Sequence, residues 1–482
     1  MKKKYYFSSI MLIVFFSAFA QDYQCIDPES TSLFEKNNGY ITTLRIDSMA
    51  VEGSDTIYFP MQTIRQLDYD CYSPSGPSWI GEKIVKRPDG SWLFYNFESD
   101  TILIYPEAKQ GEQWEMYSKN ELIVEASVSS VISSDVLDLP DSVKTISFTA
   151  YNGSHQPIEH AVESMQLQIG KAYGISRIPN FYFFPDHQED FFYNIFEEYE
   201  LVGIDKPEAG IQNLTWKSIH DYNPGDEIHT VYHQSYETSS HEIKTIKKLI
   251  SKSILGDTTV YLFQRWIENI SQNYDEEPVI TTSYDTLTLY ITPDSLFDML
   301  PGEVIMSDYD AYTHQMTGNM KEIPSEAERI IKSDDENCWN IPIVDDCISS
   351  LLYYKGLGGP YHSCTYPFSF GEISNTFVYY KKGDTEWGTP LIITSLDTKK
   401  GIPDGIRIYP NPADNYLNVE YPLTGEKTAY EIVNCMGETI SMKGEFFSEV
   451  QAIPIAFLPA GLYCIKLTDT SGNVYSQTFI KK

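Results

Sequence analysis

Apolar and polar residues alternate in short stretches along almost the whole chain, and this alternation most constrains the fold. Successive side chains of a β-strand point to opposite faces, so the pattern predicts strands with one buried face. Long helical periods are scarce. The chain also carries 36 tyrosines, and aromatic rings pack well on a pleated, half-buried surface. The sequence therefore predicts a mostly β protein, and its 482 residues suffice for several domains.

The charge balance excludes some classes of partner. Asp and Glu number 68 against 35 Lys and Arg, giving a formal net charge of −33. Such a surface repels nucleic-acid phosphates and anionic membranes. It is compatible with solubility, Ca²⁺ uptake or a cationic partner, and a soluble acidic surface is the preferred interpretation. We expect no nucleic-acid partner.

The N-terminus has the layout of a secretory signal peptide. Three lysines at positions 2–4 precede an apolar stretch at 10–16 and the small-x-small site Ala18-Phe19-Ala20. This predicts a signal peptide at 1–20, with cleavage between Ala20 and Gln21. The apolar stretch is too short to span a bilayer, which needs about 20 residues. No later stretch predicts a transmembrane helix.

Residues 406–482 consist of short alternating stretches separated by Gly, Pro and Asn turns. This pattern predicts a small Ig-like β-sandwich. The segment opens with Tyr409-Pro410-Asn411-Pro412, continues with Leu417-Asn418-Val419 and Gly461-Leu462-Tyr463, and ends with Lys481-Lys482.

This ordered set resembles the type A C-terminal sorting domains of the type IX secretion system of Bacteroidetes. The resemblance implies that outer-membrane machinery of that system reads the domain and usually removes it. It also implies a protein that is secreted or held on the outer cell surface after periplasmic transit. Cys435 and Cys464 depart from the family pattern. A polar, turn-rich linker is predicted at 396–405, and the resemblance implies processing near it.

The preceding cargo is predicted to be a multi-domain β-rich region with one unit at 21–205 and a second at 206–395. Stretches 111–148 and 225–263 show a similar order of turns and strands, which suggests an internal duplication. The cargo is similar to other Bacteroidetes surface proteins that bear the same tail, and this similarity implies no activity.

Four local predictions concern the second cargo unit. Residues 240–256 predict a helix or an exposed strand, and residues 322–333 predict a helix that begins near Pro324. The glycine-rich stretch 356–361 predicts a turn. Residues 378–390 predict a hairpin that closes the cargo.

The short pattern Asp, then Ser or Thr, then an apolar residue or Thr recurs along the cargo. Turn chemistry explains most copies, because Asp caps a turn and the following residues begin a strand. The pattern also resembles the O-glycosylation acceptor of exported Bacteroidetes proteins. That resemblance implies glycans on some of the candidate hydroxyls: Ser48, Thr56, Thr101, Ser142, Thr258, Thr286 and Ser295.

The cysteines favour disulfides over catalysis. Seven are present, so at least one lacks an intramolecular partner. Cys364 and His362 would share a strand face and form a competent nucleophile pair. In an exported protein a disulfide between Cys364 and either Cys338 or Cys347 is the preferred interpretation.

Metal and cofactor signals are weak. His229 and His233 have the spacing of a helix face, but the residues between them favour a strand, where they would lie some 13 Å apart. Asp308 and Asp310 would share a strand face and offer oxygen ligands to Ca²⁺, without a complete ligand loop. We therefore expect no cofactor.

No catalytic motif stands out, and the sequence favours a non-enzymatic adhesive or ligand-binding cargo. Aromatic residues would contact a surface glycan or peptide, although core packing is the default for the five tryptophans considered, Trp79, Trp92, Trp114, Trp216 and Trp266. The alternative is a secreted hydrolase whose catalytic carboxylates are dispersed in sequence.

Overall fold

The computed structural model describes residues 22–68, 70–185, 188–189, 194–195, 197–273, 276–333, 338–342, 350–365, 371–393, 407–420, 429–434, 439–445, 450–468 and 474–482. The predicted signal peptide with Ala20 and Gln21, the predicted linker 396–405, Cys347 and Cys435 lie outside these residues. The chain divides into two compact parts. The first runs to Leu391 apart from Ile267–Ile270 and Val279–Ser283, which belong with Ile392–Lys482 to the second. The boundary predicted between residues 205 and 206 falls inside the first part and stays a prediction.

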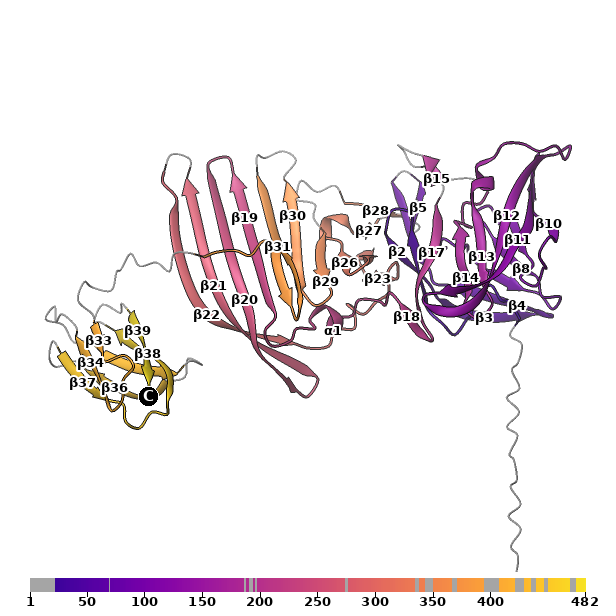
Figure 1. Ribbon diagram of the computed structural model, residues 1–482. Coiled ribbons are helices and arrows are strands. Elements are labelled where there is room, and N and C mark those ends of the chain that lie inside the picture. Colours follow the sequence, from indigo (N-terminus) through magenta and orange to yellow (C-terminus); the bar gives the residue numbers. More distant parts are fainter. Residues whose placement is uncertain are drawn as a thin grey trace, which may run out of the picture. The chain divides into compact units, whose positions relative to one another are not determined.

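Strands dominate the described residues, which confirms the predicted mostly β fold (Figure 1). The helical elements of the described residues are short: the single-turn α1 (Trp216–Ile219), η1 (Ala161–Ser164) and η2 (Glu326–Glu328). No helix among these residues has both the length and the apolar character needed to cross a membrane.

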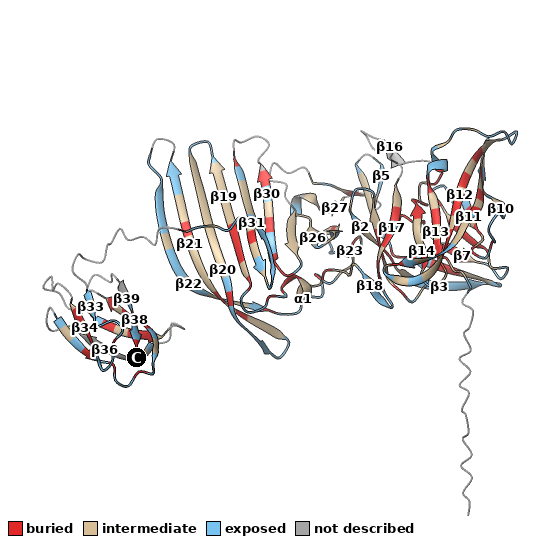
Figure 2. Cartoon of the chain, in the orientation of Figure 1, coloured by how far each residue is buried: buried red, intermediate tan, exposed pale blue. Residues whose placement is uncertain are grey.

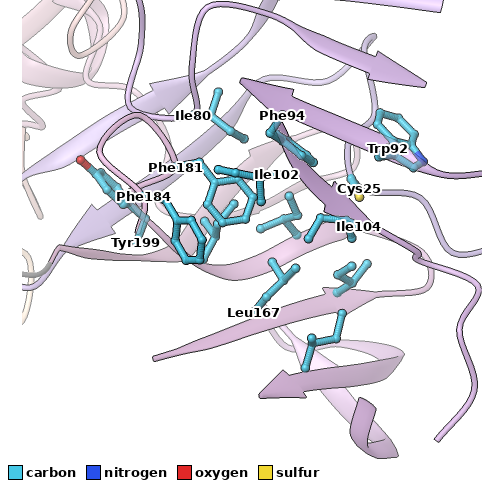
Figure 3. Close-up of a cluster of buried hydrophobic side chains, with 14 of the residues drawn as sticks. Cys25, Ile80, Trp92, Phe94, Ile102, Ile104, Leu167, Phe181, Phe184 and Tyr199 are labelled. Carbon is cyan, nitrogen blue, oxygen red and sulfur yellow. The ribbon is translucent and has the colours of Figure 1, made fainter. Parts of the chain in front are cut away.

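Two antiparallel sheets near the N-terminus share one hydrophobic core. One is the meander β3 (Ile46–Glu52), β4 (Asp55–Pro60), β7 (Ile84–Lys86), β8 (Trp92–Tyr95) and β9 (Thr101–Ile104). The other contains β10 (Gln113–Lys119), β11 (Leu122–Val136), β12 (Leu139–Asn152), β13 (Gln166–Gly170) and β14 (Gly174–Pro179). Alternate residues of both sheets enter the same cluster, where Phe94, Ile102, Phe181 and Phe184 lie together (Figure 3).

The second of these sheets continues through strands from distant parts of the sequence. β14 pairs with β17 (Glu198–Asp205), which pairs with β1 (Ser32–Lys36) and the short β18 (Glu208–Gly210). β1 pairs with β2 (Ile41–Leu44), and one residue pair, Ile41 with Met316, joins β2 to β25 (Gln315–Thr317). From there the order is β26 (Met320–Ile323), β29 (Leu351–Tyr354), β30 (Gly358–Thr365), β31 (Glu372–Lys382), β19 (Glu227–Tyr236) and β20 (Ser239–Leu255). β32 (Thr385–Gly388) pairs with the end of β31.

A further sheet joins early and late segments of the cargo. Its order is β23 (Val304–Met306), β24 (Asp310–Thr313), β27 (Ile330–Lys332), β28 (Trp339–Asn340), β6 (Cys71–Gly76) and β5 (Thr63–Asp68). A disulfide between Cys71 and Cys338 joins the same two segments. A short hairpin of β15 (Gln188–Glu189) and β16 (Asn194–Ile195) lies outside these sheets.

The helix predicted at 322–333 is wrong. β26 ends at Ile323, the 3-10 turn η2 follows, and Ile330–Lys332 form β27 between β24 and β28. Pro324 fits the break between strands, and the β-branched pair Ile330-Ile331 gains more from sheet pairing than from a helix.

The long strands of the second half are extended rather than helical. Residues 240–256 lie mainly in β20, so the strand alternative was correct. β21 (Thr258–Asn273) and β22 (Val279–Ile291) follow it, and Arg265 of β21 binds Asp285 of β22 at 2.6 Å. Figure 2 shows these strands as mostly half-buried or exposed, in contrast to the N-terminal core. The two stretches proposed as a duplication both form a strand followed by two long strands, and their common origin stays a prediction.

A fully buried lysine joins three segments of the first part. The Lys321 side chain is 0% exposed. Its Nζ donates to the carbonyl oxygens of Leu214, Phe297 and Met299 at 2.9, 2.7 and 2.7 Å and to Asn213 Oδ1 at 3.2 Å. Burial lowers the pKa of Lys321 to about 8, and the charges of Asp298 and Glu303 oppose that shift. β26 is therefore tied to the loops that precede α1 and β23.

The second part contains a small β-sandwich. One sheet holds β33 (Arg407–Tyr409), β34 (Tyr416–Glu420) and β37 (Val450–Pro454). The other holds β36 (Thr439–Glu445), β35 (Ala429–Asn434), β38 (Gly461–Thr468) and β39 (Val474–Lys481). Alternate residues such as Leu417, Val419, Ile432 and Ile465 fill the core between them. The predicted C-terminal sandwich is confirmed.

We expect Lys321→Met to destabilise the protein strongly, because it leaves four oxygen acceptors without their donor. Each unsatisfied buried polar group costs roughly 1–3 kcal/mol, so the free energy of unfolding should fall by about 3 kcal/mol or more. Urea denaturation of the mature chain measures this change. Lys332→Met, at an exposed position of β27, is the matched control and should change stability by less than about 0.5 kcal/mol. Equal stability of the two variants would contradict the role given to Lys321.

The buried His314 should make the protein sensitive to acid. Burial, followed by repulsion from Lys321 and Arg329, lowers the pKa of His314 from 6.5 to about 3. The unfolded state therefore binds the proton first, and stability falls as the pH decreases from 6.5 toward 3. The expected slope is about 1.4 kcal/mol per pH unit. His314→Phe should remove this contribution, as measured by unfolding at pH 6.5, 5.5 and 4.5, and an unchanged slope would count against it.

Candidate functional site

A hollow of about 520 Å³ lies in the first part where three segments meet. These are the turn between β25 and β26, the end of β29 with the turn that follows, and the hairpin of β31 and β32. Its lining consists of Asn319, Tyr354, Lys355, Leu357, Phe377, Tyr380, Lys382, Thr385 and Trp387. Four of these nine residues are aromatic, and the volume lies within the range of small-molecule sites.

A β-bulge in β31 turns two aromatic rings to the same face. In the register with β19, Phe377 pairs with Thr230 and Tyr379 with His229, so Val378 has no partner residue. Residues three apart in a regular strand point to opposite faces, and the extra residue reverses this. The rings of Phe377 and Tyr380 thus lie 6.2 Å apart between centroids.

Trp387 completes the aromatic surface from the neighbouring strand. It pairs directly with Tyr380, and the two rings stack with centroids 5.9 Å apart and planes 18° apart. Phe377 lies 5.4 Å from the same indole. Trp387 nevertheless remains 52% exposed. It is therefore the ring on which a ligand has most room to stack.

Two neutral phenols pack against Phe377 of the lining. Tyr354 and Tyr361 meet Phe377 edge-on, at 4.9 and 5.2 Å between centroids. Burial raises the pKa of both tyrosines, so both stay protonated. Gly358 has φ of +78°, and a Cβ there would lie 2.0 Å from the hydroxyl oxygen of Tyr222. The first residue of β30 must therefore be glycine to lie this close to Tyr222.

The lining carries two lysines and no carboxylate. Lys382 is engaged within the protein, because its Nζ lies 3.2 Å from the Asp226 carboxylate and donates to the Asp221 carbonyl. Lys355 is exposed, and its side chain forms no salt bridge within the described residues. Its backbone N–H donates to the Asn319 carbonyl at 2.9 Å, which fixes the turn beside the hollow.

A second hollow of about 310 Å³ is lined by residues that include Glu322 and Glu328. The Glu328 carboxylate accepts from the backbone N–H of Ser325 at 3.0 Å and from Ser350 Oγ at 3.1 Å. These bonds give Glu328 a structural role at η2. Glu322 is a half-buried residue of β26.

The residues considered as metal ligands do not form a site in the described part of the chain. No group of three or more His, Cys, Asp or Glu there could hold a metal ion. His229 lies in β19, with Nε2 2.8 Å from the Glu227 carboxylate and Nδ1 accepting from the Leu391 N–H. Asp310 binds Arg329 at 3.0 Å, whereas Asp308 is exposed.

Three cysteines of the described residues, Cys71, Cys338 and Cys364, are disulfide-bonded. Cys338 bonds Cys71, a pair that the sequence spacing did not suggest, so the alternative pairing of Cys338 with Cys364 is wrong. Cys364 is itself disulfide-bonded. It therefore cannot serve as a thiolate nucleophile with His362. Cys347 lies outside the described residues.

The tryptophans singled out from the sequence are not the exposed ones. Trp79 and Trp92 lie in the N-terminal core, and Trp114 donates its indole N–H to the Leu103 carbonyl at 2.8 Å. Trp216 and Trp266 are half-buried. Sequence reasoning placed Trp387 only in the closing hairpin. The sequence signal that could have identified Trp387 as a binding residue is the group of aromatic residues on both sides of one turn, Phe377, Tyr380 and Trp387.

The candidate glycosylation hydroxyls differ in accessibility. Exposed positions are Ser48, Thr101, Thr286 and Ser295. Half-buried positions are Thr56, Ser142 and Thr258. Ser142 Oγ is also hydrogen-bonded to the hydroxyl of Tyr23 at 2.8 Å. Several of these residues begin strands after a turn, as at Asp55-Thr56 and Asp257-Thr258, whereas Ser48 and Thr286 lie within strands.

In the second part, the opening motif of the tail binds the last strand. Asn411 Oδ1 accepts from the N–H of Ile480 at 2.9 Å, and the Ala413 N–H donates to the Ile480 carbonyl at 2.7 Å. Lys482 N–H donates back to Ala413 at 2.9 Å. Tyr463 stacks on Phe479 at 5.7 Å. The motif residues from both ends of the domain thus belong to one sandwich. They include Tyr409, Pro410, Pro412, Gly461 and Lys481.

Residues 407–482 match the family of the secretion system C-terminal sorting domain. The chain therefore carries a type IX secretion system C-terminal sorting domain. The sorting domain directs it to the outer cell surface or the extracellular space, and the predicted handling by the type IX machinery is supported. The match covers the tail and leaves the activity of the cargo open to proposal.

Comparisons of the whole chain with known proteins add little information about the cargo. No curated protein matches the chain. Among solved structures, the extracellular domain of a one-component system from B. thetaiotaomicron is 8% identical, with a TM-score of 0.13, 93% of this chain and 92% of that chain covered. The extracellular domain of a hybrid two-component system from the same organism gives 8% identity and a TM-score of 0.13, with 96% and 98% covered. Similarity at this level carries no argument about fold or function.

Proposed function

We propose that the cargo is a non-enzymatic binding protein whose aromatic hollow binds a saccharide on the outer cell surface or outside the cell. The observation that carries the proposal is the exposed Trp387, which stacks on Tyr380 at the mouth of the hollow. The aliphatic C–H face of a sugar ring is attracted to the negative face of an aromatic ring. Asn319 and Thr385 offer polar groups for sugar hydroxyls.

A secreted hydrolase remains the second candidate, supported by Glu322 and Glu328 at the second hollow. Glycoside hydrolysis uses two carboxyl groups on either side of the scissile bond. Glu328 is a poor candidate for a general acid or base, because its carboxylate accepts hydrogen bonds from the Ser325 N–H and from Ser350 Oγ. The aromatic hollow is therefore the better supported site.

We expect Trp387→Ala to weaken saccharide binding about fivefold or more, since stacking of a ring on one aromatic side chain contributes roughly 1–3 kcal/mol. The measurement is a glycan array of the purified mature chain, followed by calorimetric titration of the bound sugars. Trp387→Phe should restore part of the affinity. Trp266→Ala, which removes a half-buried tryptophan of β21, should leave it unchanged.

Two outcomes would contradict this assignment. One is sugar binding that is equal in Trp387→Ala and the wild type. The other is turnover of an array sugar that is lost in Glu322→Gln, because it would favour the hydrolase. A peptide array run in parallel tests whether a peptide occupies the hollow instead.

We also propose that export is accompanied by two modifications. Cleavage of a signal peptide between Ala20 and Gln21 would give the mature N-terminus, and some Ser and Thr residues of the recurring Asp-Ser/Thr pattern would carry O-linked glycans. Exposure favours Ser48, Thr101, Thr286 and Ser295 as acceptors. The hydrogen bond to Tyr23 makes Ser142 the poorest acceptor of the set.

Intact-mass analysis of protein purified from its native host tests both modifications. We expect a mass above that of the peptide beginning at Gln21, with sugar on exposed acceptors in peptide maps. Replacement of Ser48, Thr101, Thr286 and Ser295 by alanine should remove most of the added mass, whereas Ser142→Ala should remove none. A bare peptide mass would end the glycosylation proposal.

A further inference from the structure

We propose that the saccharide bound by the aromatic hollow is acidic, bearing carboxylate or sulfate groups, and that Lys355 pairs with its charge. This inference rests on the proposed function and adds the chemical class of the ligand. Its starting observation is a local reversal of charge. The chain has 68 acidic and 35 basic residues, yet the hollow is lined by two lysines and no acidic residue.

The two lysines have different roles. Lys382 is half-buried and held by Asp226 and by the carbonyl of Asp221, so its charge is largely compensated within the protein. Its methylene groups pack against the turn at Gly356, where a Cβ would come within 2.7 Å of Lys382 Cε. Lys382 is therefore a structural part of the wall.

Lys355 has the features of a ligand-binding cation. It lies directly after Tyr354, whose ring contacts Phe377 in the aromatic wall. The backbone bond from Lys355 to Asn319 fixes the turn at the rim, while the side chain is exposed and forms no salt bridge among the described residues. A flexible ammonium group beside stacked rings matches a ligand that carries an anionic group next to an apolar ring face.

The net negative charge of the protein makes the binding of an acidic saccharide depend more strongly on Lys355. An acidic surface repels an anionic saccharide at long range, so binding must depend on a local positive group whose attraction acts over a few ångströms. A neutral sugar would not need Lys355. The contribution of Lys355 should therefore be specific to acidic ligands and should weaken as salt is raised.

The test is calorimetric titration of the folded mature chain with matched probes. Galactan is the neutral probe, oligogalacturonate the carboxylated probe, and sulfated galactan the sulfated probe. Because a hydrogen bond to a charged group is stronger than a neutral one, we expect Lys355→Met to weaken acidic-probe binding roughly tenfold or more. Lys355→Arg should retain most of the affinity. Lys381→Met makes the same charge change at an exposed position of β31 outside the lining and should have little effect.

The outcomes separate this inference from the proposed function. Binding of galactan that depends on Trp387, with no preference for the acidic probes, would overturn the inference and leave the proposed function standing. Equal loss in Lys355→Met and Lys381→Met would also overturn it, because only net charge would matter. Failure of the folded wild type to bind any saccharide on the array would overturn both.

Discussion

The buried ammonium of Lys321 is the interaction on which the middle of the cargo depends. One side chain satisfies oxygens of Asn213, Leu214, Phe297 and Met299, which belong to two loops far apart in the sequence. No carboxylate is among these acceptors, so the ammonium is hydrogen-bonded to carbonyl oxygens only, and burial lowers its pKa although the nearby charges of Asp298 and Glu303 oppose the shift. A buried charge is costly unless every donor is used, and here the fold must bring both loops together to satisfy it.

This constraint extends to the proposed binding site through the sheet register. Lys321 lies in β26, whose residue Met320 pairs with Tyr354 of β29. Asn319 precedes Met320 and accepts the backbone bond of Lys355. The rim of the hollow is thus continuous with the strand that Lys321 fixes. The opposite wall comes from the bulge in β31, which places Phe377 and Tyr380 on one face. A binding surface built on two fixed strands loses little entropy when a ligand binds.

The sequence predicted the features that depend on local pattern. Alternation predicted the strands, including those of the tail sandwich, and the closing hairpin around Gly383 appears as β31 and β32. The prediction at 322–333 was wrong, because charged residues between Pro324 and Lys332 mimic a helix while Ile330 and Ile331 are taken by neighbouring strands. Here tertiary pairing outweighed local propensity.

Long-range features could not be predicted in the same way. The partner of Cys338 is Cys71, 267 residues away, and the sheet that joins them is not encoded by any local pattern. The hollow requires the turn at Asn319, the end of β29 and the hairpin at Trp387 to meet. The bulge at Val378 also interrupts the alternation from which the buried and exposed faces of a strand are predicted. The proposed acidic ligand accounts for the exposed Lys355 beside this aromatic lining in a chain of net charge −33.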